Sequence, residues 1–249
     1  MQEVEKKFKF LQVNGSPLSI YVSDELFMPN QTTAAVAEAV TLHPEERGIE
    51  IGAGIGPISI LLASRSELGH LYTVEYVEKQ LNLARRNIAK YGLEGKITPY
   101  QGNIFDPIRQ NHPEIQVDFI VSDISGMAEV PARALDWYPS AIPTGGIDGA
   151  DKVISLIEQA SQFLKPTGRL YFPVVVNFSD GDKILTVAKK HFTNVVPKSR
   201  TSLPLPADLY SKVKDLNTSS GVYAPFEQRG SRFLWHLDVY EATQPKSRE

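Results

Sequence analysis

Apolar residues along the chain follow two spacings that alternate with each other. Short apolar runs at 49–51, 71–74 and 117–121 have the length and composition of buried strands. The stretch from Glu78 to Tyr91 instead carries apolar residues at helical spacing with a polar opposite face, and Gly92 follows as a C-cap. Strands and helices that alternate in this way predict an α/β protein with a parallel sheet.

A separate pattern precedes this core. Apolar alternation from Phe8 to Val22 is broken by the turn residues 14–17, which predicts a hairpin. A loop and a helix through residue 40 follow, with Thr32 or Thr33 as the expected cap. We therefore assign residues 1–30 to an N-terminal hairpin and cap, and residues 31–249 to the main domain.

The last third of the chain has a less regular pattern. A helix is expected at 183–191, and strands are expected at 195–196 and 233–240. Between those strands lies a long polar insert, 198–230, with three prolines. Long inserts in compact domains are lids, binding loops or disordered segments, and we interpret this one as a substrate lid.

The glycine-rich stretch after the first buried run indicates a binding site. Gly52, Gly54 and Gly56 stand where a strand would turn tightly into a helix. Without a Cβ, a glycine adopts positive φ readily and lets backbone amides approach a ligand closely. The helix that follows would point its free amides at the same place. This loop, with Ala53 inside it, is therefore expected to hold a cofactor.

Two glutamates indicate what kind of cofactor fits. Glu50 comes just before the glycines, where it would favour a sulfonium or amino group and oppose a phosphate. Glu75 ends the next strand about 20 residues further on, the spacing at which a carboxylate binds a ribose diol in doubly wound folds. Together they favour a nucleoside with a cationic group.

The segment Glu50-Ile51-Gly52-Ala53-Gly54-Ile55-Gly56, with Glu75, resembles motif I and the acidic loop of class I S-adenosylmethionine-dependent methyltransferases. The resemblance implies a doubly wound, seven-stranded, mostly parallel sheet of the Rossmann-like methyltransferase type, with helices on both faces and S-adenosyl-L-methionine as cofactor. It also extends the cofactor site to Tyr76 and to Gly102-Asn103-Ile104. In that segment Asn103 stands where the family often has an Asp, and its amide oxygen can accept the same hydrogen bond.

A second resemblance covers residues 119–176. The segment 147–151 and the strand entry 165–171 are similar to the GxDGL and LKPGG segments of the release-factor glutamine N-methyltransferases. Their NPPY tetrad is replaced by Asp123-Ile124-Ser125-Gly126, so this resemblance implies a relative with a different acceptor. Upstream, the turn 27–29 resembles a VFxP turn that covers the cofactor in some methyltransferases.

Asp123 is the expected catalytic residue, because it ends a strand beside the glycine loop, where open α/β sheets bind their ligands. Its carboxylate could hold a substrate ammonium, remove a proton from the acceptor, or bind only the cofactor. A structural alternative is that it caps the next loop. The acceptor itself is expected to contact four residues: Phe27, Pro29, Ser125 and Gly126.

Composition and net charge indicate which partners, metal sites and cell compartments to expect. The net charge of -3 does not favour nucleic acid. The chain has no cysteine and no clustered histidines, so a metal site is not expected. A charged N-terminus and the lack of a long apolar run predict a cytoplasmic protein without a membrane span. A homodimer is left open.

These observations predict a methyltransferase that modifies a nitrogen or oxygen of a small-molecule acceptor. Methyl transfer depends mainly on alignment, so the absence of an obvious acid–base dyad is no objection. Two alternatives remain at this point. One is a protein glutamine or RNA N-methyltransferase, and the other is a non-catalytic protein that only binds the cofactor.

Overall fold

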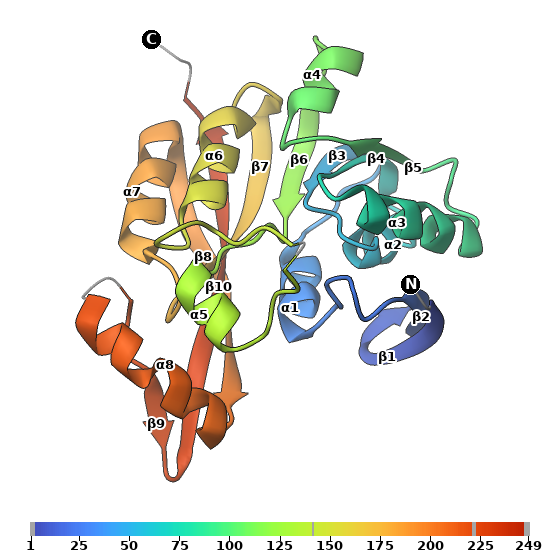
Figure 1. The fold of residues 1–249 in the computed structure, drawn as a ribbon. Coiled ribbons are helices and arrows are strands. Elements are labelled where there is room, and N and C mark those ends of the chain that lie inside the picture. Colours follow the sequence, from blue (N-terminus) through green and yellow to red (C-terminus); the bar gives the residue numbers. More distant parts are fainter. Residues whose placement is uncertain (1–2, 141, 221–222, 247–249) are drawn as a thin grey trace.

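The computed structural model describes residues 3–140, 142–220 and 223–246. One central sheet runs in the order β5-β4-β3-β6-β7-β10-β8, and the short strand β9 pairs with β10 at one end (Figure 1). Neighbours from β5 to β7 are parallel, whereas β10 is antiparallel to β7 and to β8. The mostly parallel pairing is confirmed, and the sheet has the predicted seven strands in its main order, with the short β9 as an eighth. The strands of this sheet are β3 (Glu46–Ile51), β4 (Leu68–Glu75), β5 (Ile97–Gln101), β6 (Val117–Ser122), β7 (Leu164–Val175), β8 (Phe192–Leu205), β9 (Glu227–Arg229) and β10 (Arg232–Pro245).

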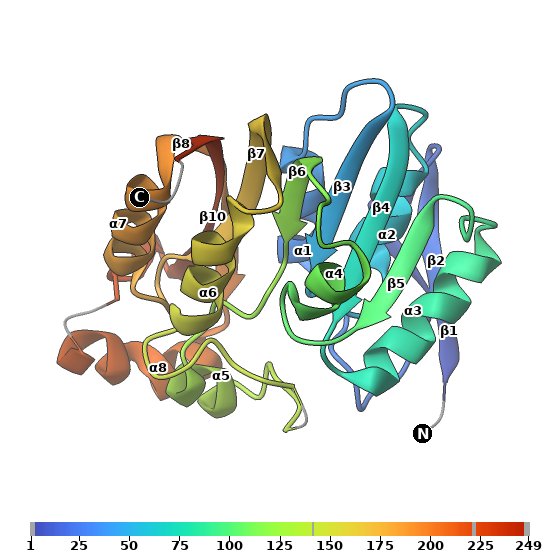
Figure 2. The ribbon, with the colours of Figure 1, turned by 90° about the horizontal axis from the view of Figure 1, so that it is seen from above.

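Helices cover both faces of the sheet, and each face has its own apolar core. One core joins α1, α2 and α3 to the sheet, and the other joins α4, α6 and α7 to the opposite face (Figure 2). This two-sided burial is the reason that the parallel strands are almost continuously apolar. The helices are α1 (Gln31–Ala39), α2 (Pro57–Ala63), α3 (Glu78–Lys90), α4 (Asp106–Asn111), α5 (Glu129–Ala134), α6 (Asp151–Ala160), α7 (Gly181–His191) and α8 (Ala207–Ser220).

The predicted N-terminal hairpin is present and is attached to the glycine loop. Strands β1 (Val4–Val13) and β2 (Ser16–Val22) form a separate two-stranded sheet. The fully buried Asn87 of α3 accepts from the Tyr21 backbone N–H at 2.7 Å and donates to the carbonyl of Ile55 at 2.9 Å. One side chain therefore fixes the hairpin and the loop after β3 to the same helix.

The cap of α1 differs from the prediction. The N-cap is Asn30, whose side chain accepts from the Thr32 backbone N–H at 2.8 Å, and Thr33 completes a capping box. Thr32 and Thr33 were expected as the cap because both are good N-cap residues. Asn30 is favoured equally and stands one residue before the helix, so it takes the role instead.

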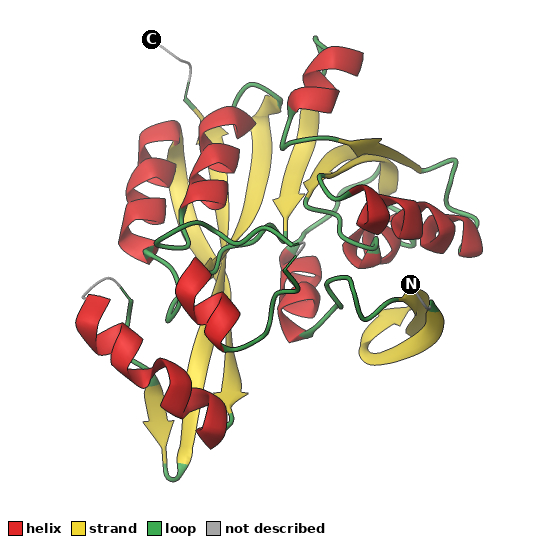
Figure 3. Ribbon diagram, in the orientation of Figure 1, coloured by secondary structure: helices red, strands yellow, loops and turns green. Residues whose placement is uncertain are grey.

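The region expected to be a long irregular insert is largely regular structure. Strand β8 runs along β10 to Leu205, and α8 follows it at the end of the molecule where β10 extends beyond the parallel strands (Figure 3). Pro204 was one of the prolines that suggested a loop, but it lies in β8, an edge strand, where a missing N–H is tolerated. Within the described parts of the chain, no helix is both long and apolar enough to cross a bilayer.

Candidate active site

The glycine loop between β3 and α2 has the backbone that the sequence requires. Gly52 and Gly54 have φ of 79° and 57°, in the region that residues with a Cβ rarely adopt. A Cβ on Gly52 would also lie 3.2 Å from the Ile124 backbone. The N–H of Gly54 donates to the Oε2 atom of Glu75 at 2.8 Å. The loop is thus tied to the end of the neighbouring strand.

Glu75 is held in a defined position by backbone donors. Its Oε1 atom accepts from the Val77 N–H at 2.7 Å and from the Gln80 side chain at 3.3 Å. Burial raises the pKa of Glu75, and the hydrogen bonds from Val77 and Gly54 oppose that shift. A carboxylate has about four acceptor positions. The backbone of Tyr76 donates to this carboxylate as well, so a ligand hydroxyl would share an oxygen of Glu75 with one of these four donors.

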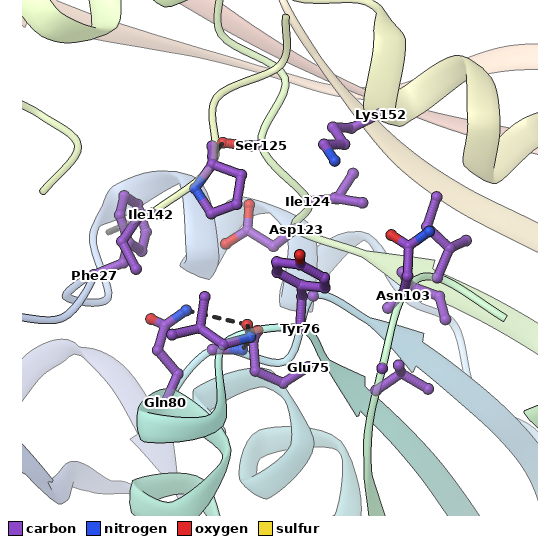
Figure 4. A pocket seen from close by; sticks show the side chains of 18 of the residues that line it. Phe27, Glu75, Tyr76, Gln80, Asn103, Asp123, Ile124, Ser125, Ile142 and Lys152 are labelled. Carbon is purple, nitrogen blue, oxygen red and sulfur yellow. Dashed lines mark hydrogen bonds between the residues drawn. The ribbon is translucent and has the colours of Figure 1, made fainter. Parts of the chain in front are cut away.

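A cavity, here called the glycine-loop cavity, opens over this loop (Figure 4). Glu75 and Asp123 face the same space from opposite sides, and Lys152 extends from α6 toward Ile124. The structure brings most of the predicted cofactor residues into its lining: Gly52, Gly54, Glu75, Tyr76, Gly102, Asn103, Ile104 and Asp123. Phe27 and Ser125, predicted to contact the acceptor, also line it.

Glu50 and Ala53 line a smaller adjoining chamber instead, together with Pro29 and Asp123. Glu50 is 1% exposed and accepts a short hydrogen bond from the Ser59 hydroxyl. Burial raises the pKa of Glu50 to about 8, and the nearby negative charges of Asp123 and Glu75 add to the shift. The chamber is therefore suited to a positive group that would favour the ionised carboxylates.

Gly56, which was predicted to contact the cofactor, lies behind the loop and packs against α3. It is the N-cap of α2, has φ of 88°, and packs with its Cα side toward Ala84 of α3, where a Cβ would lie 3.4 Å from the Ala84 Cβ. It does not contribute to the described lining of the glycine-loop cavity or of the smaller chamber. The third glycine thus lets α2 and α3 pack closely beside the loop.

Asp123 lies where the cavities meet. It follows β6, and its Oδ2 atom accepts from the Thr33 hydroxyl of α1 at 3.0 Å. Burial raises the pKa of Asp123 to about 7, and the hydrogen bond from Thr33 opposes that shift. Its side chain borders the glycine-loop cavity, the smaller chamber and a third cavity. This position allows contact with a cofactor on one side and an acceptor on the other.

The third cavity, here called the tryptophan cavity, lies on the far side of Asp123. Phe27 and Gly126, both predicted to contact the acceptor, line it, and the rings of Phe27 and Tyr138 are 5.4 Å apart. Ser125 lies elsewhere, because its hydroxyl donates to the Pro143 carbonyl at 2.8 Å. Of the four predicted acceptor residues, the structure therefore places two beside this cavity.

Sequence reasoning missed several residues that line these cavities. Tyr138, Ile142 and Lys152 come from the segment after Asp123, and Gln80 comes from α3. The segment 127–150 has no clear periodicity, so its path could not be anticipated. A weak signal was present for Gln80, which is close to Glu75 in the chain and is, with Asn87, one of two polar residues on the buried face of α3.

A first prediction concerns Glu75. Replacing Glu75 with Ala should weaken S-adenosylmethionine binding by more than about tenfold, because charge-assisted hydrogen bonds contribute roughly 1.5–3 kcal/mol. Calorimetric titration measures the change. The matched control is Glu78→Ala, an exposed glutamate three residues away at the start of α3, which should bind normally. A loss below about twofold in Glu75→Ala would refute the assigned role.

A second prediction concerns pH. Because its folded pKa of about 8 exceeds the ordinary value of 4.5, Glu50 binds a proton more tightly in the folded state. The tighter proton binding of folded Glu50 contributes fully to the free energy of unfolding below pH 4.5, and this contribution is lost as pH rises through 8. The melting temperature of the ligand-free protein should therefore fall between these values by roughly 10 °C more than that of Glu50→Gln.

Thermal melts at closely spaced pH values measure this difference. Glu38→Gln, at an exposed position of α1, is the control and should melt with the wild-type pH dependence. Parallel pH curves for wild type and Glu50→Gln would contradict the raised pKa of Glu50.

Comparisons with known proteins agree with this geometry. A family described as a methyltransferase domain matches residues 42–224. A release factor glutamine methyltransferase of Thermosynechococcus vestitus is 27% identical over 188 residues, which cover 72% of this chain and 64% of that protein. A ribosomal protein uL3 glutamine methyltransferase of Bradyrhizobium diazoefficiens is 28% identical over 170 residues, covering 61% and 52%. The chain thus matches less than two thirds of the length of these relatives.

Solved structures support the fold. The precorrin-6y C5,15-methyltransferase of Geobacter metallireducens superposes with a TM-score of 0.55 at 11% identity, over 90% of this chain and 93% of that one. The TYW2 protein of M. jannaschii, solved in complex with AdoMet, gives a TM-score of 0.51 at 14% identity, over 98% and 88%. At such low identity the likeness concerns the fold alone.

Proposed function

We propose that this chain, which belongs to the methyltransferase domain family, uses S-adenosylmethionine to methylate a side-chain nitrogen of a protein. The observation that carries the proposal is the position of Asp123 between the glycine-loop cavity and the tryptophan cavity. A carboxylate there can accept a hydrogen bond from the N–H of an acceptor.

The expected small-molecule acceptor is not supported by the comparisons. The relatives in two groups are named for glutamine methylation of a release factor and of ribosomal protein uL3. Their names support the alternative of a protein acceptor over the small-molecule interpretation. That interpretation rested on the low net charge and on the missing NPPY tetrad, and neither observation excludes a polypeptide.

The residues of the glycine-loop cavity fit the cofactor. Three carboxylates, those of Glu50, Glu75 and Asp123, have raised pKa values because they are buried, and they surround a loop of backbone amides. Such a site opposes a phosphate but suits a ligand with cationic groups and ribose hydroxyls. We assign the hydroxyls to Glu75 and the cationic group to the chamber beside Glu50.

The chain's own contribution to the reaction is mainly orientation. S-adenosylmethionine supplies a methyl group that its positive sulfur already activates. Asp123 would align the acceptor nitrogen by accepting its N–H, and would take the proton that the nitrogen loses as it gains the methyl group. Phe27 and Tyr138 would exclude water beside it. Alignment of this kind can supply an effective molarity of roughly 10⁵ M or more.

A small-molecule nitrogen or oxygen is the second candidate. The segment Asp123-Ile124-Ser125-Gly126 favours it, because Gly126 offers no aromatic ring and Ile124 and Ser125 replace the two prolines of the tetrad. An acceptor other than glutamine is compatible with that change.

Label transfer in a cell extract separates the candidates. The purified protein is incubated with an extract and tritium-labelled S-adenosylmethionine, and acid-precipitable label is then digested with protease or ribonuclease. We expect precipitable, protease-sensitive label that depends on added enzyme. Enzyme-dependent label in an acid-soluble product that separates from S-adenosylmethionine, with none precipitable, would establish a small-molecule acceptor. Ribonuclease-sensitive label would establish an RNA acceptor, and either result would overturn the proposal.

A further inference from the structure

The tryptophan cavity is larger than one acceptor side chain requires. Its volume is about 610 Å³, within the range of roughly 300–1,000 Å³ typical of pockets for drug-sized ligands. A side chain that reaches Asp123 occupies only one end of this space. The remaining walls are mainly apolar and come from five regions of the chain, among them Leu26, Met127, Trp137, Val175, Leu203 and Trp235.

The charged residues that line the tryptophan cavity are all negative. Its charged residues, within the described chain, are Asp123 and Asp136, and it contains no Lys, Arg or His. Asp136 is at the rim, with its side chain 88% exposed and 3.9 Å from the ammonium of Lys212. Asp123 alone therefore projects a carboxylate into the interior. A negative group in this cavity would face that carboxylate without a compensating cation.

We propose that the tryptophan cavity binds an apolar side chain next to the acceptor residue in the polypeptide, and that Asp123 makes the cavity select against negatively charged occupants. This inference rests on the proposed protein acceptor. Burying an apolar neighbouring side chain against these walls stabilises the complex by about 25 cal/mol for each Å² of apolar surface removed from water. Like charges brought together in a poorly solvated site are strongly unfavourable. The substrate class is thus a nitrogen-bearing side chain flanked by a bulky apolar residue.

The protein contains its own reporter for this cavity. It has two tryptophans, Trp137 and Trp235, and both line the cavity with their rings 5.1 Å apart. Tryptophan emission therefore reports occupancy of the tryptophan cavity without a contribution from other sites. The measurement needs neither cofactor nor methyl transfer.

Three probes with the same aromatic group test charge selection. 3-Phenylpropionamide, 3-phenylpropylamine and 3-phenylpropionate carry a neutral amide, an ammonium and a carboxylate, respectively. Each is titrated at pH 8.5, where Asp123 is ionised. We expect the amide and the amine to change the emission and to bind roughly tenfold or more tightly than the carboxylate.

Two variants test whether the Asp123 carboxylate causes the preference against the negatively charged probe. Asp123→Asn should reduce the preference over the carboxylate to less than about threefold, because the repelling charge is gone. Asp136→Asn is the matched control and should keep the wild-type preference, because its charge is exposed and near Lys212. Asparagine also tolerates the φ of 55° at position 136. Trp137→Phe should retain part of the response through Trp235.

The outcomes are distinct from those of the proposed function. Equal binding of all three probes, binding of the carboxylate alone, or no emission change with any probe would overturn the inference even if protein label is found. Should Asp123→Asn fail to fold, the wild-type comparison of the three probes still decides. If the probes bind selectively but no protein becomes labelled, the cavity selects against negative charge as proposed, and the acceptor is not a protein.

Discussion

Replacing Gly54 with Val is expected to abolish S-adenosylmethionine binding. Gly54 has φ of 57°, and its N–H is bonded to the Glu75 carboxylate at 2.8 Å. A β-branched residue disfavours this backbone region strongly. The space beside a Cβ at position 54 is open, with Gln80 Oε1 as the nearest atom at 3.9 Å, so the new side chain would project into the ligand's cavity. Binding should fall by roughly a hundredfold or more.

Calorimetry with S-adenosylmethionine measures this loss, and a second glycine provides the control. Gly92, at the end of α3, has a similar φ of 64° and no atom near its Cβ position. Gly92→Val therefore introduces comparable backbone strain away from the site and should bind normally. If folded Gly54→Val binds as tightly as the wild type, the glycine loop is not the cofactor site.

Replacing Asp123 with Asn should reduce turnover by roughly 10²-fold while cofactor affinity stays nearly unchanged, because a positioned base contributes on that scale. Asparagine has the same shape and can still accept from the Thr33 hydroxyl, but it cannot take a proton. With a pKa of about 7, wild-type Asp123 becomes ionised as pH rises, so turnover should increase through that pH. The variant should lack this increase.

Turnover and affinity are measured separately, by label transfer and calorimetry, with Asp136→Asn as the control at the cavity rim. A large loss of cofactor affinity with unchanged turnover at saturation would show that Asp123 holds only the cofactor. An unchanged pH profile in the variant would also contradict its role toward the acceptor.

The sheet and the loop were predictable because their signals are local. Apolar runs gave the parallel strands, and the spacing from Gly54 to Glu75 placed both residues at the same edge of the sheet. Strand β8 was missed beyond its first residues, since an edge strand tolerates the prolines that normally indicate a loop.

Contacts between distant segments could not be predicted. The bond from Thr33 to Asp123 joins residues 90 positions apart, and nothing in the spacing of either segment indicates it. Tyr138 reaches the site from the segment 127–150, which has no clear periodicity. The raised pKa of Glu50 depends on complete burial, which only the packing of α2 and the sheet determines.

Mass spectrometry of a methylated product identifies the atom that receives the methyl group. A cell extract is incubated with the enzyme and S-adenosylmethionine carrying a trideuterated methyl group, and proteins are digested and sequenced by fragmentation. We predict one trideuteromethyl group on a side-chain nitrogen, next to a bulky apolar residue, with wild-type enzyme and a strongly reduced amount with Asp123→Asn. A trideuteromethyl group found only on small molecules, or on a protein oxygen or carbon, would contradict the account.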